Sequence, residues 1–234
     1  MCARTTLTAV IMKQVDFYFD FVSPYAWLAV HQLGAVRDCT GARFRFVPVL
    51  FAGLLNHHAN VGPAEIPAKR RYTFRDAQRW AMHLGLQFKS PPAHPFNPLK
   101  PLRVTSAIDD QTSRETLALA LLDAAWSDGR DITSDTVIKD VAHNTGVDGN
   151  ALLARAQDDA TKRQLRQQTE DAVAAGVFGV PTFMVDGEIF WGNDRLPFLQ
   201  AYLQGKLTTD KSQIELILSR PRAADRDRSR ITDL

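Results

Sequence analysis

The chain of 234 residues contains little of what a disulfide framework, a membrane span or a nucleic-acid surface requires. Its two cysteines, Cys2 and Cys39, are too few and too far apart for a disulfide framework or a four-ligand zinc site. No apolar run reaches the roughly 18 residues of a transmembrane helix. The 28 basic and 26 acidic residues leave a net charge of only +2, which gives no electrostatic reason to expect a nucleic-acid or membrane partner. We therefore expect a globular protein of a reducing compartment, the cytoplasm.

Two further absences concern targeting and metals. The N-terminal segment lacks the long apolar stretch and the cleavage site of a signal peptide, and Met12 is an alternative translation start to Met1. A histidine pair stands at 57–58, but no Cys, His or Asp cluster at ligand spacing accompanies it, so we expect no metal site. We expect flexible termini at 1–12 and at 219–234, where the tail is rich in Arg and Asp and poor in large apolar residues.

The most informative segment is a strand that runs directly into a helix. Between residues 15 and 21 every second residue is Val or Phe, which is the period of a buried strand. Ser23 and Pro24 follow as an N-cap and a first helical residue, and the apolar spacing predicts a helix to about Val36. A second strand is predicted over 44–50. This βαβ unit favours parallel strands with a right-handed crossover.

The middle of the chain shows no convincing strand. Glycines, prolines and polar residues predict an irregular loop over 51–67, and the five prolines of 90–101 exclude regular structure there. Helices are predicted at about 69–84, 102–108, 112–125, 133–143 and 151–175, the last as one long helix or a broken pair. Thr112-x-x-Glu115 is a candidate capping box for the third of these.

Strands return near the C-terminus. Apolar runs at 182–185 and 189–191 are joined by Asp186-Gly187, a strong signal for a two-residue hairpin turn. A final helix is predicted over about 194–204, where Gly205 stops it.

The order of elements is therefore βαβ, an all-helical stretch, and ββα. We predict an α/β protein with a thioredoxin-like βαβ…ββα fold and an inserted all-helical domain. The thioredoxin-like domain would be discontinuous, over 13–50 and 176–207, and the insertion would span 51–175. In such a unit the first helix begins at the carboxyl end of the sheet, where ligands bind.

Ser23 begins that helix. Serine is a favoured N-cap, so a purely structural role is the simpler interpretation. The position also suits an anion, because free backbone N–H groups and the helix dipole favour negative charge. If the anion is a ligand thiolate, a hydroxyl hydrogen bond of about 1.5–3 kcal/mol, with about 0.3–1 kcal/mol from the dipole, can lower the thiol pKa by about two units. No general base is visible beside Ser23, so a serine nucleophile is the weaker hypothesis.

Two later segments suit an extended ligand. Val180-Pro181 precedes the third strand. A trans proline at a strand start is the ordinary interpretation, whereas a cis bond would turn the N–H and C=O of Val180 outward to pair with a peptide. Asn193 or Asp194 would cap the last helix, and backbone N–H groups there would equally suit a carboxylate. Asp194 would suit an amino group.

Three motifs together resemble one family. They are FYFDFVSPY at 17–25, VFGVPTF at 177–183 and WGNDRL at 191–196. They are similar to the 2-hydroxychromene-2-carboxylate isomerases, a family related to kappa-class glutathione transferases and thioredoxin-like disulfide oxidoreductases, and the similarity spans about 15–205. The resemblance implies a glutathione-dependent cis–trans isomerase of an aromatic 2-oxo acid, active in aromatic compound catabolism. It also implies a homodimer.

The resemblance assigns roles to particular residues. It implies that Ser23 is catalytic and holds the glutathione thiolate, and that Val180 and Pro181 pair with the cysteinyl backbone. The γ-glutamyl end would lie near Trp191, Gly192, Asn193 and Asp194. The thiolate would add to the conjugated substrate, a bond would rotate, and glutathione would leave.

The substrate half of the site departs from the family. Members carry a lysine in the loop after the second strand, whereas residues 50–58 here contain none. We expect substrate contacts from Asn56, His57, Phe96 and Asn97. The basic residues Lys69, Arg70, Arg71, Arg75 and Arg79 are most simply a solvated helix face, with an anion-binding role for one of them as the alternative.

Other functions stay open at this point. A kappa-type glutathione transferase or peroxidase would share the site but consume glutathione. A disulfide oxidoreductase is disfavoured because the stretch 23–26 has no thiol. A binding module without catalysis is the remaining alternative, because a fold alone does not fix a function.

Overall fold

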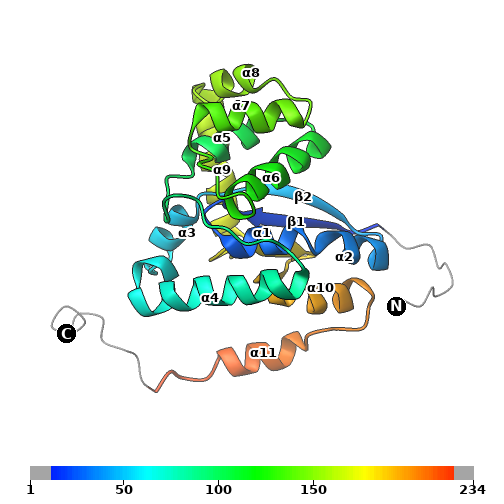
Figure 1. The fold of residues 1–234 in the computed structure, drawn as a ribbon. Coiled ribbons are helices and arrows are strands. Elements are labelled where there is room, and N and C mark those ends of the chain that lie inside the picture. Colours follow the sequence, from blue (N-terminus) through cyan, green and yellow to red (C-terminus); the bar gives the residue numbers. More distant parts are fainter. Residues whose placement is uncertain (1–11, 224–234) are drawn as a thin grey trace.

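Four strands form one mixed sheet in the order β2-β1-β3-β4 (Figure 1). The structure is a computed structural model that describes residues 12–223. The strands are β1 (Gln14–Phe19), β2 (Arg43–Pro48), β3 (Thr182–Val185) and β4 (Glu188–Trp191). β1 pairs with β2 in parallel and with β3 in antiparallel, and β3 pairs with β4 in antiparallel. The predicted α/β, thioredoxin-like arrangement is confirmed.

The first crossover contains two helices where one was predicted. α1 (Pro24–Val30) and α2 (Leu33–Thr40) are separated by a short break, at which the Gln32 N–H donates to Ala29 O at 3.0 Å. This bond spans three residues instead of four, so the helix tightens and changes direction. Gly41 ends α2 at φ +69°, the left-handed conformation that glycine adopts without a steric penalty.

The segment between β2 and β3 is helical throughout its regular parts (Figure 1). Its α-helices are α3 (Phe51–His57), α4 (Pro67–Leu84), α5 (Leu99–Ser106), α6 (Gln111–Trp126), α7 (Asp135–Asn144), α8 (Gly149–Arg155) and α9 (Asp159–Ala174). The predicted helical insertion is therefore confirmed, and 151–175 is a broken pair, α8 and α9. The division into two separate domains stays a prediction.

Three predictions within the insertion are wrong. Regular structure is not excluded throughout 90–101, because α5 begins at Leu99 and contains Pro101. Residues 51–67 are not an irregular loop, because they contain α3 and the 3-10 turn η1 (Pro63–Glu65). Thr112 and Glu115 do not form the cap of α6: the Asp110 carboxylate accepts from the Ser113 N–H at 2.8 Å. Glu115 instead forms an ion pair with Arg37 at 2.7 Å.

One face of the sheet carries an aromatic core. Phe17 lies 5.0 Å, centroid to centroid, from both Phe46 and Phe183 and 5.4 Å from Phe19. These rings are buried in one cluster with residues of α1, α2, α6 and α10 (Leu196–Leu203). Strand alternation places these aromatic side chains on one face, as their spacing predicted.

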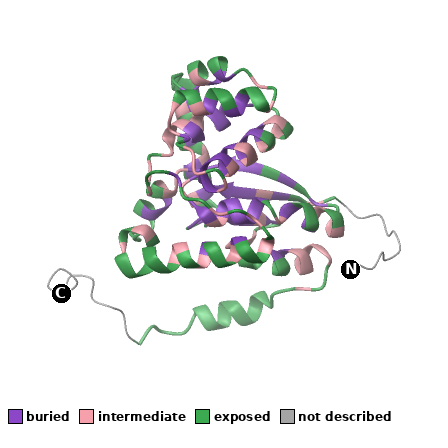
Figure 2. Cartoon of the chain, in the orientation of Figure 1, coloured by how far each residue is buried: buried purple, intermediate pink, exposed green. Residues whose placement is uncertain are grey.

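The opposite face is covered as well. Tyr18 and Val47 form a second cluster with Leu54 of α3 and Ala172 of α9. Burial on both faces explains why the second half of β1, residues 17–19, consists entirely of buried aromatic residues (Figure 2).

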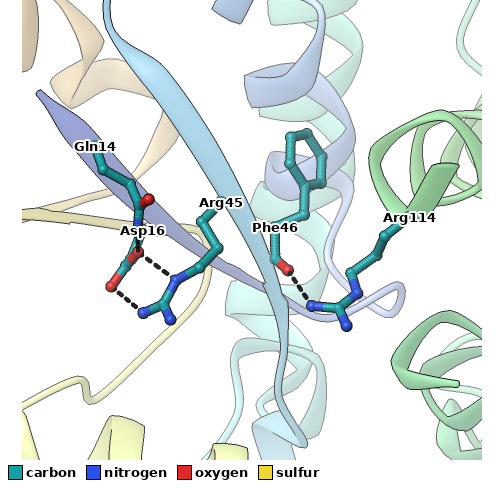
Figure 3. A network of polar contacts seen from close by, with 5 residues as sticks. All are labelled: Gln14, Asp16, Arg45, Phe46 and Arg114. Atoms are coloured by element: carbon teal, nitrogen blue, oxygen red, sulfur yellow. Dashed lines mark hydrogen bonds and ion pairs between the residues drawn. The ribbon is translucent and has the colours of Figure 1, made fainter. Parts of the chain in front are cut away.

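Polar contacts support the strand pair β1–β2 from both of its sides (Figure 3). The Arg45 guanidinium makes a two-point contact with the Asp16 carboxylate, with Nε–Oδ1 at 2.7 Å and Nη2–Oδ2 at 2.5 Å. Arg114 of α6 donates to Phe46 O at 3.5 Å and, more closely, to Ile108 O. The second contact set ties the helical insertion to β2.

The C-terminal part returns to the sheet and then leaves it. Asp186 and Gly187 both have positive φ, 53° and 79°, as a type I′ hairpin turn requires. The 3-10 turn η2 (Asn193–Arg195) leads into α10. An unpredicted helix, α11 (Lys211–Leu218), lies beyond α10 with mostly exposed residues (Figures 1 and 2). The expected flexible ends lie largely outside the described residues.

Candidate active site

Ser23 lies where the sheet and α1 meet. It is the N-cap of α1, is 8% exposed, and its Oγ accepts a hydrogen bond from the Ala26 N–H at 3.3 Å. Because this contact uses a lone pair of the oxygen, the hydroxyl proton stays available to donate to a ligand. The structural and the functional interpretation of Ser23 are therefore compatible.

A buried carboxyl group binds two backbone N–H groups near Ser23. Asp20 is fully buried, and its two oxygens accept from the Val22 N–H at 3.0 Å and the Phe51 N–H at 2.9 Å. It thereby joins the turn before α1 to the beginning of α3. Burial raises the pKa of Asp20 to about 7, because desolvation disfavours the charged form more than the two hydrogen bonds favour it.

Two hollows meet beside this turn. A cavity of about 260 Å³ includes Ser23 and Asp20 in its lining, and a groove of about 590 Å³ runs along the turn before β3 and the end of β4. Five residues line both: Tyr25, Phe51, Leu55, Pro63 and Val180. A ligand in the groove can therefore reach a second molecule in the cavity.

The cavity is mostly apolar. Its lining includes the rings of Phe51, Phe74 and Phe96 with Pro95 and Leu55. The charged or titratable groups that border it are Asp20, Tyr25, Glu65, Arg70 and His94. Its walls come mainly from the helical insertion, on α3, α4 and the proline-rich segment after α4.

The groove has a larger polar share than the cavity, and it contains the predicted glutathione residues except Ser23, which lines the cavity. Val180, Pro181, Trp191, Gly192, Asn193 and Asp194 all line it. The Val180-Pro181 peptide bond is cis, and the Gly192 N–H donates to Pro181 O at 2.9 Å, so the two segments are directly connected. The Nδ2 of Asn193 is buried and has no hydrogen-bond partner in the described part of the chain. Buried polar groups ordinarily have a hydrogen-bond partner, and a ligand oxygen or an ordered water can supply one here.

The substrate residues predicted from the sequence are not brought together. Phe96 lines the cavity. His57 lines a separate hollow near α9, with Arg103 and Arg166, and Asn56 is exposed and lines neither the cavity nor the groove. The Asn97 side chain accepts from the Leu99 N–H at 3.0 Å and thus supports the first turn of α5.

The site also contains Tyr25, to which the sequence assigned no role, and Lys69, one of the basic residues weighed there for anion binding. Tyr25 lines both hollows and donates through its hydroxyl to Asp76 Oδ2 at 2.9 Å; burial and this carboxylate raise the Tyr25 pKa, so the phenol stays neutral. Lys69 of α4 lines the groove and supplies an ammonium group that residues 50–58 lack. Asp20 could have been singled out from the sequence. An acid between two phenylalanines, near the end of a predicted buried strand, indicates a buried carboxyl group.

His94 connects the proline-rich segment to the Ser23 turn. Its Nε2 lies 3.0 Å from Val22 O, and because a carbonyl oxygen only accepts, this nitrogen carries the proton. Burial lowers the pKa of His94. The imidazole packs edge-on against Phe74 and Trp126, at 5.1 and 5.5 Å.

Residues 12–223 contain no group of three or more His, Cys, Asp or Glu side chains placed to hold a metal ion. In the same range, no helix has the length and apolar character that crossing a bilayer needs.

Known proteins share this fold and sequence. A family model described as a DSBA-like thioredoxin domain matches residues 14–204. A 2-hydroxychromene-2-carboxylate isomerase of Sphingobium xenophagum is 31% identical over 193 residues, which cover 82% of this chain and 98% of the relative. Glutathione S-transferase kappa 2 of Caenorhabditis elegans is 28% identical over 206 residues, covering 82% and 92%. A solved 2-hydroxychromene-2-carboxylate isomerase superposes with a TM-score of 0.77 at 27% identity, covering 88% of this chain and all of that one.

Proposed function

The chain belongs to the DSBA-like thioredoxin family, among relatives named 2-hydroxychromene-2-carboxylate isomerases, and from this premise we propose that it is a glutathione-dependent cis–trans isomerase of an aromatic 2-oxo acid. The observation that carries the proposal is the junction of the two hollows. A groove with a larger polar share, suited to a tripeptide, adjoins a mostly apolar cavity lined by Ser23.

The first step of the proposed reaction is ionisation of the glutathione thiol. A thiol of this type has a pKa of about 8.5, so little of it is ionised at neutral pH. Ser23 donates its hydroxyl proton to the sulfur as a hydrogen bond, while its oxygen still accepts from the Ala26 N–H. A hydrogen bond to a charged group contributes about 1.5–3 kcal/mol, which corresponds to a pKa lowered by one to two units.

The groove binds the rest of the tripeptide. Val180, beside the cis proline, pairs with the cysteinyl backbone. Asn193 donates its unpaired Nδ2 protons to the γ-glutamyl carboxylate, and Asp194 accepts from the γ-glutamyl amino group. Lys69, on the opposite wall, suits a carboxylate of the same molecule.

The cavity binds the aromatic substrate. The thiolate adds to the conjugated carbon–carbon double bond, and its electron pair forms the new C–S bond while the former π electrons move onto the carbonyl oxygen. The resulting carbon–carbon single bond rotates. Reversal of the addition breaks the C–S bond, restores the double bond in the trans geometry, and releases the thiolate unchanged.

A glutathione transferase or peroxidase is the second candidate, because a kappa-class transferase is 28% identical to this chain. The two differ in the fate of the thiol. An isomerase leaves the free thiol concentration constant, whereas a transferase forms a stable conjugate and consumes one thiol for each product molecule.

A single assay tests both candidates. 2-Hydroxychromene-2-carboxylate is incubated with the protein with and without reduced glutathione, the absorbance of the ring-opened trans product is followed, and free thiol is measured at the end. We expect turnover only with glutathione, with all of the thiol recovered. Loss of thiol in proportion to product would favour the transferase, and equal rates with and without glutathione would contradict both. The homodimer and the cytoplasmic location stay predictions.

A further inference from the structure

The cationic residues at the start of α4 lie at three different places. Lys69 lines the groove, Arg70 lines the apolar cavity, and Arg71 and Arg75 line a separate hollow on the surface. Consecutive helical residues point about 100° apart, so one turn of α4 supplies a different cation to each hollow. Arg70 is the only Lys or Arg among the described residues that line the cavity.

The Arg70 guanidinium is oriented but not neutralised. Its Nη2 donates to His94 O at 3.2 Å, and its central carbon lies 5.5 Å from the centre of the Phe74 ring. Within residues 12–223 it forms no ion pair with a carboxylate. Because a guanidinium has five N–H donors, it retains enough of them for a two-point contact with a carboxylate.

The other charged groups of the cavity determine where the carboxylate of a bound acid would lie. Asp20 is fully buried and, when ionised, repels a carboxylate. Glu65 is exposed, and its Oε1 already accepts from the Gly62 N–H at 2.7 Å. Arg70 is exposed as well. A carboxylate is therefore favoured at Arg70, with the apolar part of the ligand among the buried rings.

The volume and lining suit a single aromatic ring with a short side chain. An apolar protein cavity of about 150 Å³ accepts benzene, and this cavity measures about 260 Å³. Phe51, Phe74 and Phe96 supply ring faces and edges for aromatic contacts.

We propose that Arg70 is a specificity-determining residue that binds the carboxylate of an aromatic acid whose ring occupies the cavity beside Ser23. The proposal rests on the proposed function for the identity of the site, and it assigns the recognition of the acid to α4 in place of the segment 50–58. Neutral aromatic molecules of the same shape would enter the cavity but bind more weakly.

The test compares two unreactive probes of equal shape, trans-cinnamate and trans-cinnamamide, by calorimetric binding to the full chain without glutathione. In Arg70→Gln we expect cinnamate affinity to fall by about tenfold, the effect of one charge-assisted contact, with cinnamamide affinity unchanged. Arg70→Lys should retain part of the cinnamate affinity. Arg71→Gln, a matched loss of charge one residue away, should change neither.

An unchanged cinnamate affinity in Arg70→Gln, an equal loss for both probes, or a wild-type protein that does not bind cinnamate would overturn the proposal. Because glutathione is absent, these results are independent of the isomerase assay. A wild-type protein that binds cinnamate through Arg70 but shows no glutathione-dependent turnover would overturn the proposed function alone.

Discussion

The groove and the cavity meet at Val180, yet they are built in different ways. The groove is formed largely by the two chain reversals on either side of β3 and β4, at 178–181 and 191–195. The cavity takes most of its walls from α3, α4 and the segment 94–98, which belong to the helical insertion. Both hollows contain aromatic rings, but the groove has the larger share of polar surface, whereas the cavity is mostly apolar around one buried acid.

This difference matches the two ligands of the proposed reaction, with glutathione in the groove and the second substrate in the cavity. Glutathione is the same molecule in every reaction of this kind, and turns fixed by glycine and proline suit a constant ligand. In the proposed reaction, the second substrate would be recognised by side chains on helices, which can change without disturbing the sheet. The following predictions test whether the two hollows can be altered separately.

The largest effect is expected from the acid of the cavity. Asp20 has a folded-state pKa of about 7 against an ordinary value of 3.8, so the folded protein holds a proton that the unfolded chain releases. The associated stability is fully present below the unfolded pKa and is lost as the pH rises to about 7. Between about pH 5 and pH 8, the free energy of unfolding should fall by roughly 2 to 3 kcal/mol more in the wild type than in Asp20→Asn.

Urea unfolding of both proteins at the two pH values measures this difference. Comparison with the variant also cancels the opposite contribution of His94, whose pKa burial lowers. If both proteins show the same change with pH, Asp20 does not titrate as a buried group, and the electrostatic description of the cavity is wrong.

The next largest effect is expected from a substitution confined to the groove. Gly192 has φ 110° and ψ 151°, a conformation that is essentially restricted to glycine, and an added Cβ would lie close to Asp194 Oδ1. Gly192→Ala should weaken glutathione binding by about tenfold, or about 1.4 kcal/mol, because the strained alanine would displace the turn that lines the groove. Cinnamate binding should be unchanged.

Calorimetric titration with each ligand checks this prediction. Gly34→Ala is the matched control, because an added Cβ on α2 meets no atom within 4 Å. Equal losses for glutathione and cinnamate would mean that the two hollows are not independent.

The smallest effect is expected from Lys69. It is exposed where it lines the groove, and a solvated charge contributes at most about 1 kcal/mol. Lys69→Gln should therefore weaken glutathione binding by about two- to fivefold, and the loss should shrink at high salt. An unchanged affinity at low salt would remove Lys69 from the site, and Arg71→Gln again serves as the control.

The sequence predicts the framework well because its signals are local. Alternating apolar residues identify β1, Asp186-Gly187 identifies the hairpin, and Ser23-Pro24 identifies the start of α1. Each depends on backbone geometry or on a period of two, so neighbouring residues are sufficient. Many of the groove residues lie in or beside turns of this kind, so they too could be predicted from local sequence.

The cavity could not be predicted in this way. Arg70 and His94 meet only because α4 and the proline-rich segment fold back over Ser23, which is a long-range contact without a local signal. Asn97 is predicted to contact the substrate, but its side chain instead accepts from the Leu99 N–H just before α5. The sequence predicts a loop at α3 because its glycine, asparagine and histidine disfavour a helix. In the structure, Leu54 packs between the sheet and α9, and this tertiary contact overrides the local preference.

The most direct test of this account is an ultraviolet titration of the glutathione thiol bound to the wild type, to Ser23→Ala and to Ser23→Asp. Ser23→Asp can still cap α1, but it has no hydroxyl to donate at neutral pH and adds a negative charge. We expect the bound thiol pKa to lie one to two units below about 8.5 in the wild type and to return to about that value or higher in both variants. The same thiol pKa in all three proteins would contradict the claim that Ser23 stabilises the thiolate.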